Sequence, residues 1–268
     1  MLGKLLKYEI PAVGRRLAPM YIAWLAASVL LGLTAGRFDG SNGFMIIPAL
    51  IYFGVTIAVF VMAVVLIIQR YYNSLFGDEG YFNHVLPVTA AEHIMSKTLT
   101  ALVWTVLTML AALVSGLIIA LLIGGAGAVW GDEPLSWPAF WSEYSSDFRI
   151  VKSLLLILEF LTAMIFSIVK SILAVYAAIT IGHIAKNHVV LASIGAYIGL
   201  MVFESTLGNI FISLGFVTGQ NANFSSLFSS EYTAMQAMLG IAIVASLALS
   251  AVYFFICQFF MENKLDLA

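Results

Sequence analysis

Residues 44–69 read FMIIPALIYFGVTIAVFVMAVVLIIQ, a run without a single charged side chain. A helix needs roughly 20 apolar residues to cross the hydrocarbon core of a bilayer, which is about 30 Å thick. This run is long enough, and its few polar residues do not recur at the spacing of a helix that has one face in water. It therefore predicts a membrane-spanning helix.

Similar apolar runs occupy most of the remaining chain. The composition is 62% hydrophobic and only 10% charged, whereas soluble domains carry about a quarter charged residues. The mean hydropathy is +1.03. We therefore expect an all-α, polytopic membrane protein with six transmembrane helices. The expected spans are residues 17–36, 44–69, 98–123, 153–182, 189–203 and 233–261.

The fifth apolar run extends over residues 189–217 and is too long for one ordinary span. Polar residues and a glycine interrupt it between Glu204 and Asn209. We expect the helix to break there, with residues 210–217 forming a short return element whose backbone is satisfied by protein or water. One long tilted helix is the alternative.

The distribution of Lys and Arg predicts that both termini are cytoplasmic. Six spans place the termini on one side, together with the loops after the second and fourth spans, and most basic residues lie there. The other side is mainly acidic, and its expected loops are 37–43, 124–152 and 209–232. The basic residues of the expected cytoplasmic side are Lys4, Lys7, Arg15, Arg16, Arg70, Lys97, Lys186 and Lys264.

Residues 1–16 have the pattern of an amphipathic helix on the membrane surface, ahead of a single transmembrane domain over residues 17–268. Leu2, Leu6 and Ile10 share one helical face, and basic residues occupy the other. Glu9 projects from the apolar face, so it needs a protein partner or a route to water. An exposed Glu9 in a frayed turn is the alternative for this carboxylate, and a cleaved signal peptide is the alternative for the segment.

The connection between the second and third spans, residues 70–98, has the features of an ordered segment. Thr89 and Glu92 form a T-x-x-E capping box that begins a helix running into the third span, and Pro87 ends any helix before it. Several of its residues are too apolar for a solvated loop and require a surface to pack against. They are Phe76, Tyr81, Phe82, Val85 and Leu86.

The same connection contains an acidic-Gly-aromatic stretch, a Leu-Pro-Val-Thr turn and a Ser-Lys pair. These residues are Asp78, Glu79, Gly80, Tyr81, Leu86, Pro87, Val88, Thr89, Ser96 and Lys97. Their order resembles the cytoplasmic loop of the ABC-2 family of transporter permeases. The resemblance covers the whole chain in architecture and about thirty residues in motif.

The resemblance implies the membrane-spanning subunit of an ATP-driven exporter in the plasma (inner or cytoplasmic) membrane. Its loop would be the coupling helix that a separate ABC ATPase subunit holds, and folding of the loop only against its own subunit is the alternative. The candidate coupling residues are Asp78, Glu79, Gly80, Tyr81, Phe82, Leu86, Pro87 and Glu9.

The resemblance also implies the other components of such an exporter. ATP and Mg would be held by the partner, because this chain has no GxxxxGK[ST] phosphate loop, and we expect no enzyme activity and no cofactor in it. A second permease subunit, identical or a sibling, would pair with it in the lipid bilayer, and no nucleic acid is expected. The expected cargo is an amphipathic peptide, lipid or drug.

Three ionisable residues lie in or near the spans: Glu159, Lys170 and Glu204. Each costs roughly 2.5–3.5 kcal/mol there unless it faces water or a partner. Glu159 and Lys170 share a helical face but are about 16 Å apart along the axis, so they cannot pair directly. We expect Lys170 to face a central cavity or a carboxylate on another helix, and the two glutamates to lie near the outer mouth of a translocation pathway.

Other interpretations of these charges stay open. Snorkelling of the two glutamates with a structural ion pair at Lys170 is one. An ion-coupled secondary transporter or channel without an ATPase partner is a second class of function, and a membrane-anchored scaffold or sensor subunit is a third.

No catalytic or metal site is expected. The only cysteine, Cys257, lies in an apolar run and predicts a packing role. The four histidines lie at the expected cytoplasmic ends of the spans and are more typical of interfacial residues than of metal ligands. Gly195 and Gly199 form a GxxxG pattern that predicts a close helix contact, within the chain or between chains.

Overall fold

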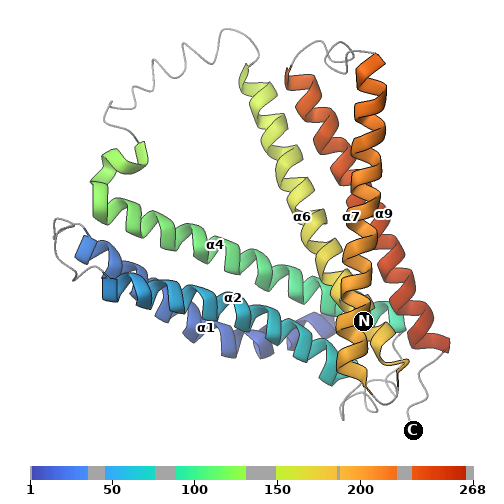
Figure 1. Cartoon of the computed structure of the whole chain (residues 1–268). Coiled ribbons are helices and arrows are strands. Elements are labelled where there is room, and N and C mark those ends of the chain that lie inside the picture. The colour runs from blue at the N-terminus through green and yellow to red at the C-terminus, as the bar shows by residue number, and fades with distance from the viewer. Residues whose placement is uncertain are drawn as a thin grey trace. The chain divides into compact units, whose positions relative to one another are not determined.

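The computed structural model describes residues 2–35, 46–75, 89–130, 149–185, 188–221 and 231–263, and these residues form α-helices without a strand (Figure 1). Each of the six helices contains a stretch that is long and apolar enough to cross a membrane. The prediction of an all-α, multi-pass membrane protein is confirmed at this level. The helices are α1 (Leu2–Ala35), α2 (Ile46–Leu75), α4 (Ala90–Trp130), α6 (Arg149–Gly182), α7 (Val189–Asn221) and α9 (Glu231–Asn263).

The chain divides into two compact units. Unit 1 consists of Met1–Asn73 and Leu99–Arg149, and unit 2 of Ser74–Thr98 and Ile150–Ala268. The first turns of α4 therefore belong to unit 2, whereas the rest of this helix belongs to unit 1.

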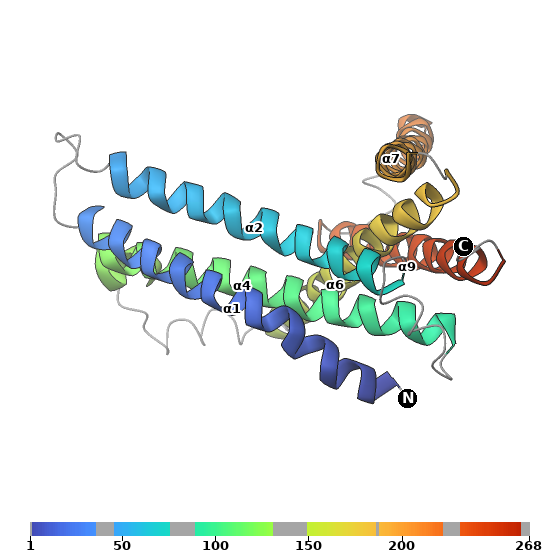
Figure 2. The ribbon, with the colours of Figure 1, turned by 90° about the horizontal axis from the view of Figure 1, so that it is seen from below.

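In unit 1, α1, α2 and α4 lie side by side (Figures 1 and 2). Hydrogen bonds between polar side chains join every pair of these helices. Such bonds between membrane helices contribute about 0.6 kcal/mol each on average, and they fix which faces meet. The bonds are Tyr21 to Thr108 (2.6 Å), Trp24 to Thr56 (2.8 Å) and Tyr52 to Ser115 (2.9 Å).

Small residues let the helices of unit 1 approach closely. A Cβ atom on Gly14 would lie 2.7 Å from Cζ2 of Trp104, so the indole occupies the space that a side chain would need. A small cluster of buried apolar residues lies beside this contact. It contains Val13, Leu17, Ala63 and Leu66, with Tyr21 and Trp104 packed against it.

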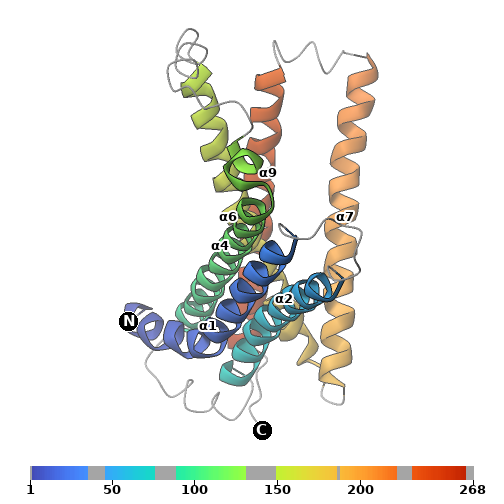
Figure 3. The same ribbon diagram turned by 90° about the vertical axis from the view of Figure 1, so that its left-hand side faces the viewer.

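In unit 2, α6 is the most enclosed helix and α7 the least. Within the most apolar window of each span, 44% of the α6 residues are buried but none of the α7 residues. The α7 ribbon runs apart from α9 along much of its length (Figure 3). The buried residues of α9 recur every three or four positions, so they form one stripe along the helix. The stripe is Ser246, Ser250, Tyr253, Cys257 and Met261.

The break expected in the fifth span is wrong. Helix α7 runs from Val189 to Asn221 without interruption, so one long helix, the alternative, is what forms. Its polar residues are satisfied without opening the helix, because Ser205 Oγ and Thr206 Oγ1 both donate to the Val202 carbonyl, at 2.9 and 2.7 Å. Glu204 has a partner on α6, described below.

The N-terminal segment also differs from the expectation. Residues 2–35 form one helix, α1, rather than a separate helix over 1–16 followed by a span, and the apolar stretch reaches back to Leu5. Pro11 and Pro19 lie inside α1. Each removes one backbone N–H donor, a loss that membrane helices tolerate when neighbouring groups satisfy the freed carbonyl.

The helices extend further than the expected spans. Helix α4 continues to Trp130, α6 begins at Arg149, and α7 ends at Asn221, so all three reach into the expected outer loops 124–152 and 209–232. Helix α2 likewise extends to Leu75, into the expected connection 70–98. Charged and turn-forming residues mark the ends of the apolar runs, but they do not end these helices, which continue past them.

Candidate functional site

Helices α6 and α7 form an antiparallel hairpin that closes on a very tight contact. A Cβ atom on Gly182 would lie 2.6 Å from the backbone N of Ser193, closer than real atoms approach. Ser193 Oγ donates to the Val189 carbonyl at 2.8 Å, which holds its side chain against its own helix. The absence of a side chain at residue 182 thus sets the register of the hairpin.

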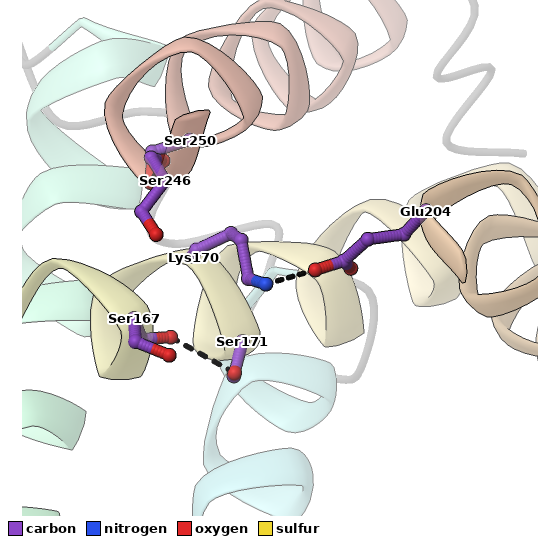
Figure 4. A network of polar contacts seen from close by, with 6 residues as sticks. All are labelled: Ser167, Lys170, Ser171, Glu204, Ser246 and Ser250. Carbon is purple, nitrogen blue, oxygen red and sulfur yellow. Dashed lines mark hydrogen bonds and ion pairs between the residues drawn. The ribbon is translucent and has the colours of Figure 1, made fainter. Parts of the chain in front are cut away.

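That register brings Lys170 and Glu204 to the same level. At about 1.5 Å per residue they lie about 18 and 17 Å from the Gly182 contact, one on each helix. Lys170 Nζ donates to Glu204 Oε1 and forms an ion pair with it (Figure 4). The structure therefore gives Lys170 a carboxylate partner on another helix.

The ion pair borders a cavity of about 440 Å³ between α6 and α7, here named the ion-pair cavity. The pair is not sealed, because 17% of the Lys170 side chain and 29% of the Glu204 side chain are exposed. Polar and apolar groups share the lining. It consists of Lys170, Ser171, Ala174, Tyr197, Leu200, Met201, Glu204 and Ser205.

Helix α9 contributes hydroxyl groups near this level. Ser246 and Ser250 face the part of α6 that carries Lys170 (Figure 4), and both are buried. Tyr253 is 1% exposed, its hydroxyl has no hydrogen-bond partner among the described residues, and it lies within electrostatic range of Glu204. Three helices of unit 2 therefore place polar groups around one charged pair.

Glu159 occupies a second, separate polar contact. Gln236 Nε2 on α9 donates to Glu159 Oε1 at 3.4 Å, and Glu159 Oε2 is buried without a partner in the described part of the chain. As the helical spacing predicts, Glu159 does not pair with Lys170; it lies about 16 Å from Lys170 along α6.

Most of the candidate coupling residues lie outside the described residues. These are Asp78, Glu79, Gly80, Tyr81, Phe82, Leu86 and Pro87.

The capping box that follows this segment is confirmed. Glu92 N donates to Thr89 Oγ1 at 3.3 Å, and Thr89 N donates to Glu92 Oε2 at 3.4 Å, so α4 begins directly after Thr89. The next turns are buried in unit 2, with Ser96 and Lys97 only 1% and 6% exposed. Tyr176 Oη of α6 donates to the Lys97 carbonyl at 3.4 Å and adds a second tie.

Glu9 pairs with Arg70. Arg70 Nε donates to Glu9 Oε2 at 2.5 Å, and 14% of the Glu9 side chain is exposed. Glu9 is therefore not a solvated residue in a frayed turn, and its partner is a basic residue of the same unit. The pair joins the N-terminal part of α1 to the last turns of α2.

Several residues of these sites carry no strong signal in the sequence. Ser171 and Ser205 directly follow the two charged residues, and Tyr197 lies about two turns before Glu204 on the same face of α7. Gln236 is a lone polar residue near the start of an apolar run. A search for polar residues within two turns of each intramembrane charge finds Ser171, Ser205 and Tyr197, but not Gln236, which lies on another helix.

The GxxxG pattern of α7 makes no close contact with the rest of the described chain, because a Cβ atom on Gly195 or Gly199 would meet nothing within 4 Å. Cys257 is buried, in agreement with a packing role. Among the described residues no three His, Cys, Asp or Glu side chains gather closely enough for a metal ion.

Six apolar helices with a charged pair inside two of them define a multi-pass α-helical membrane protein with an ionisable site within its spans. No protein-family model, curated protein or solved structure matches this chain.

Proposed function

We propose that this chain is the membrane-spanning permease subunit of an ATP-driven ABC exporter. A separate nucleotide-binding subunit would hydrolyse ATP on the cytoplasmic side, and the spans would pass an amphipathic substrate across the plasma membrane. The support comes from the six spans, from the order of residues in segment 70–98, and from the way in which that segment joins the helices.

The anchored start of α4 is the observation that carries this proposal. The reciprocal bonds of Thr89 and Glu92 fix the first residue of the helix, and Tyr176 of α6 holds the Lys97 carbonyl. A displacement of the residues just before Thr89 would move α4 and α6 together. The first turns of α4 are capped and buried, so they move as a unit with the side chains packed against them. A coupling segment requires such a connection.

The other end of the same segment is also held. Arg70 lies in the last turns of α2, and its bond to Glu9 ties α2 to α1. Movement of the segment would therefore act on the first two helices as well. This is the role in coupling that we propose for Glu9.

Within the spans, we propose that Lys170, Glu204 and Glu159 line the translocation pathway. Ionisable groups at this depth are costly unless they face a partner or a polar route. The cavity beside Lys170 and Glu204 within unit 2 has a mainly apolar lining, and these two residues give it one charged wall.

A second candidate function is an ion-coupled secondary transporter or a channel that needs no ATPase. The observation that favours it is the incompletely enclosed Lys170–Glu204 pair, since charged groups inside the spans of secondary transporters bind coupling ions. This alternative predicts transport by the chain alone, driven by an ion gradient.

The test is affinity purification of the tagged chain from its native membranes, with identification of the proteins that accompany it. We expect an ABC-type ATPase to co-purify, and Glu79→Gln and Tyr81→Ala to reduce its yield. Glu143→Gln and Tyr144→Ala are matched controls, because they alter an acidic-aromatic pair on the expected outer side. Full transport by the purified chain without an ATPase would contradict the proposal and favour the second candidate.

A further inference from the structure

The charges of the ion-pair cavity do not satisfy one another fully. A lysine ammonium has three N–H donors, and among the described residues Lys170 Nζ donates only to Glu204 Oε1. Glu204 Oε2 accepts no hydrogen bond within the same part of the chain, and 29% of that side chain is exposed. Both partners therefore have free hydrogen-bonding capacity beside an open cavity.

The described lining of the cavity has no net charge. Of the residues that the structure describes, only Lys170 and Glu204 bring charges to this lining, one of each sign. A ligand with a net charge would leave one charge unmatched where the surroundings are apolar, and an unmatched charge there is costly. A ligand with one positive and one negative group can match both residues at once.

The two protein charges are in direct contact, so the two charges of a ligand must also be close together. A phosphate and an ammonium group joined by a short linker meet this requirement. Phosphate would accept bonds from Lys170 Nζ, and the ammonium would donate to Glu204. Ser171 and Ser205, one residue beyond each charge, line the same wall. Their hydroxyls donate to the Ser167 and Val202 carbonyls of their own helices, and their oxygens can still accept a bond from the ligand ammonium.

The rest of the cavity suits an apolar attachment. Its volume of about 440 Å³ lies within the range of roughly 300–1,000 Å³ found for small-molecule sites. Such a volume holds a head group and not the whole of a lipid. Leu200 and Met201 supply apolar wall, and Met201 is 54% exposed, so an acyl chain can continue along α7.

We infer that the ion-pair cavity binds the zwitterionic head group of an amphiphile, with its anionic group against Lys170 and its cationic group against Glu204. The inference rests on the proposed function in giving the exporter a substrate class. Binding itself needs neither ATP nor an ATPase, so the two proposals fail separately.

The binding test uses the purified full chain in detergent and defined lipids, with native mass spectrometry to count bound lipid and thermal unfolding to check the fold. Phosphatidylethanolamine carries both charges, phosphatidylglycerol only the phosphate, and a trimethylammonium lipid only the cation. We expect the zwitterionic lipid to bind about tenfold or more tightly than either, because each of the others loses one charge-assisted bond. Soluble phosphoethanolamine should bind much more weakly, because it lacks the apolar part.

Four variants separate ligand binding from a structural role of the ion pair. Lys170→Gln and Glu204→Gln should each weaken phosphatidylethanolamine binding about tenfold, whereas Thr162→Ala, at a residue of α6 outside the cavity lining, should not change it. The exchanged variant Lys170→Glu/Glu204→Lys keeps an ion pair and should keep the fold, but it presents the wrong sign to each ligand group and should lose binding.

Equal binding of phosphatidylglycerol or the trimethylammonium lipid by the unaltered chain would overturn the inference. Tight binding of soluble phosphoethanolamine would overturn its amphiphile part. Phosphatidylethanolamine binding by the exchanged variant at the level of the unaltered chain would show that the pair is only structural. The lipid comparison on the unaltered chain decides the question even if a variant fails to fold.

Discussion

Lys170 of α6 pairs with Glu204 of α7 because both residues lie at nearly the same distance from the turn that joins their helices. The close approach of Gly182 to Ser193 sets that distance. The ion pair is thus a consequence of hairpin register, and changes at the turn and at the pair should be linked.

Removing one charge of the pair should destabilise the protein more than removing both. Lys170→Gln or Glu204→Gln leaves an unmatched charge in the span, and we expect each to lower the free energy of unfolding by on the order of 2 kcal/mol. The double variant should lose clearly less than the sum of the two. Unfolding in detergent, analysed as a double-mutant cycle, measures this coupling; additive losses would mean that the two residues do not interact.

A methyl group at residue 182 should disturb the hairpin. Gly182→Ala places a Cβ atom against the backbone of Ser193, so we expect a loss of about 1–3 kcal/mol and a weaker Lys170–Glu204 coupling. Gly195→Ala is the matched control, because it adds the same atom to α7 where nothing lies within 4 Å. Thermal unfolding of both variants is the measurement, and equal effects would refute the register argument.

The N-terminal cap of α4 should be sensitive to the Thr89 hydroxyl. Thr89→Ala removes the acceptor for the Glu92 N–H and should cost about 1 kcal/mol, while Thr89→Ser should retain most of it. Thr162→Ala serves as the comparison, because the Thr162 hydroxyl donates only to a carbonyl of its own helix. We expect this variant to change the free energy of unfolding by no more than about 0.5 kcal/mol. Hydrogen exchange of the first turns of α4 reports the effect locally; unchanged exchange in Thr89→Ala would contradict the capping role.

The Glu9–Arg70 pair should couple α1 to α2 in function as well as in stability. We expect Glu9→Gln and Arg70→Gln each to cost about 1 kcal/mol, a modest value because one third of the Arg70 side chain is exposed. In the proposed exporter both variants should also lower transport per ATP hydrolysed, to a similar extent and without further loss in the double variant. Independent losses in the double variant would show that the pair does not transmit movement.

Composition and apolar runs were sufficient to predict the helical membrane fold, because the bilayer permits few other solutions for such a sequence. The capping box at Thr89 was predictable for a similar reason, since its bonds are local. The predicted break in α7 was wrong. The hydroxyls of Ser205 and Thr206 donate to the Val202 carbonyl of the preceding turn, so the helix can continue, and residue type alone does not reveal these bonds.

The partners of the intramembrane charges were less accessible to sequence reasoning. Because a lysine is costly to bury, Lys170 was expected to face a carboxylate or a cavity. Whether that carboxylate was Glu159 or Glu204 depended on helix spacing and on the register of the hairpin. Helix spacing excluded Glu159. The register follows from the Gly182 contact between residues of two helices, and the cavity and the Gln236 contact with Glu159 arise from the same kind of packing.

Site-specific crosslinking in native membranes shows whether segment 70–98 contacts an ATPase. The buried Cys257 is first replaced by alanine, and a single cysteine is introduced as Glu79→Cys or, for comparison, as Glu143→Cys. We predict that a thiol-reactive crosslinker joins the Glu79→Cys variant to a nucleotide-binding polypeptide and leaves the Glu143→Cys variant unlinked. Absence of that product from Glu79→Cys, or its equal formation from Glu143→Cys, would contradict the account.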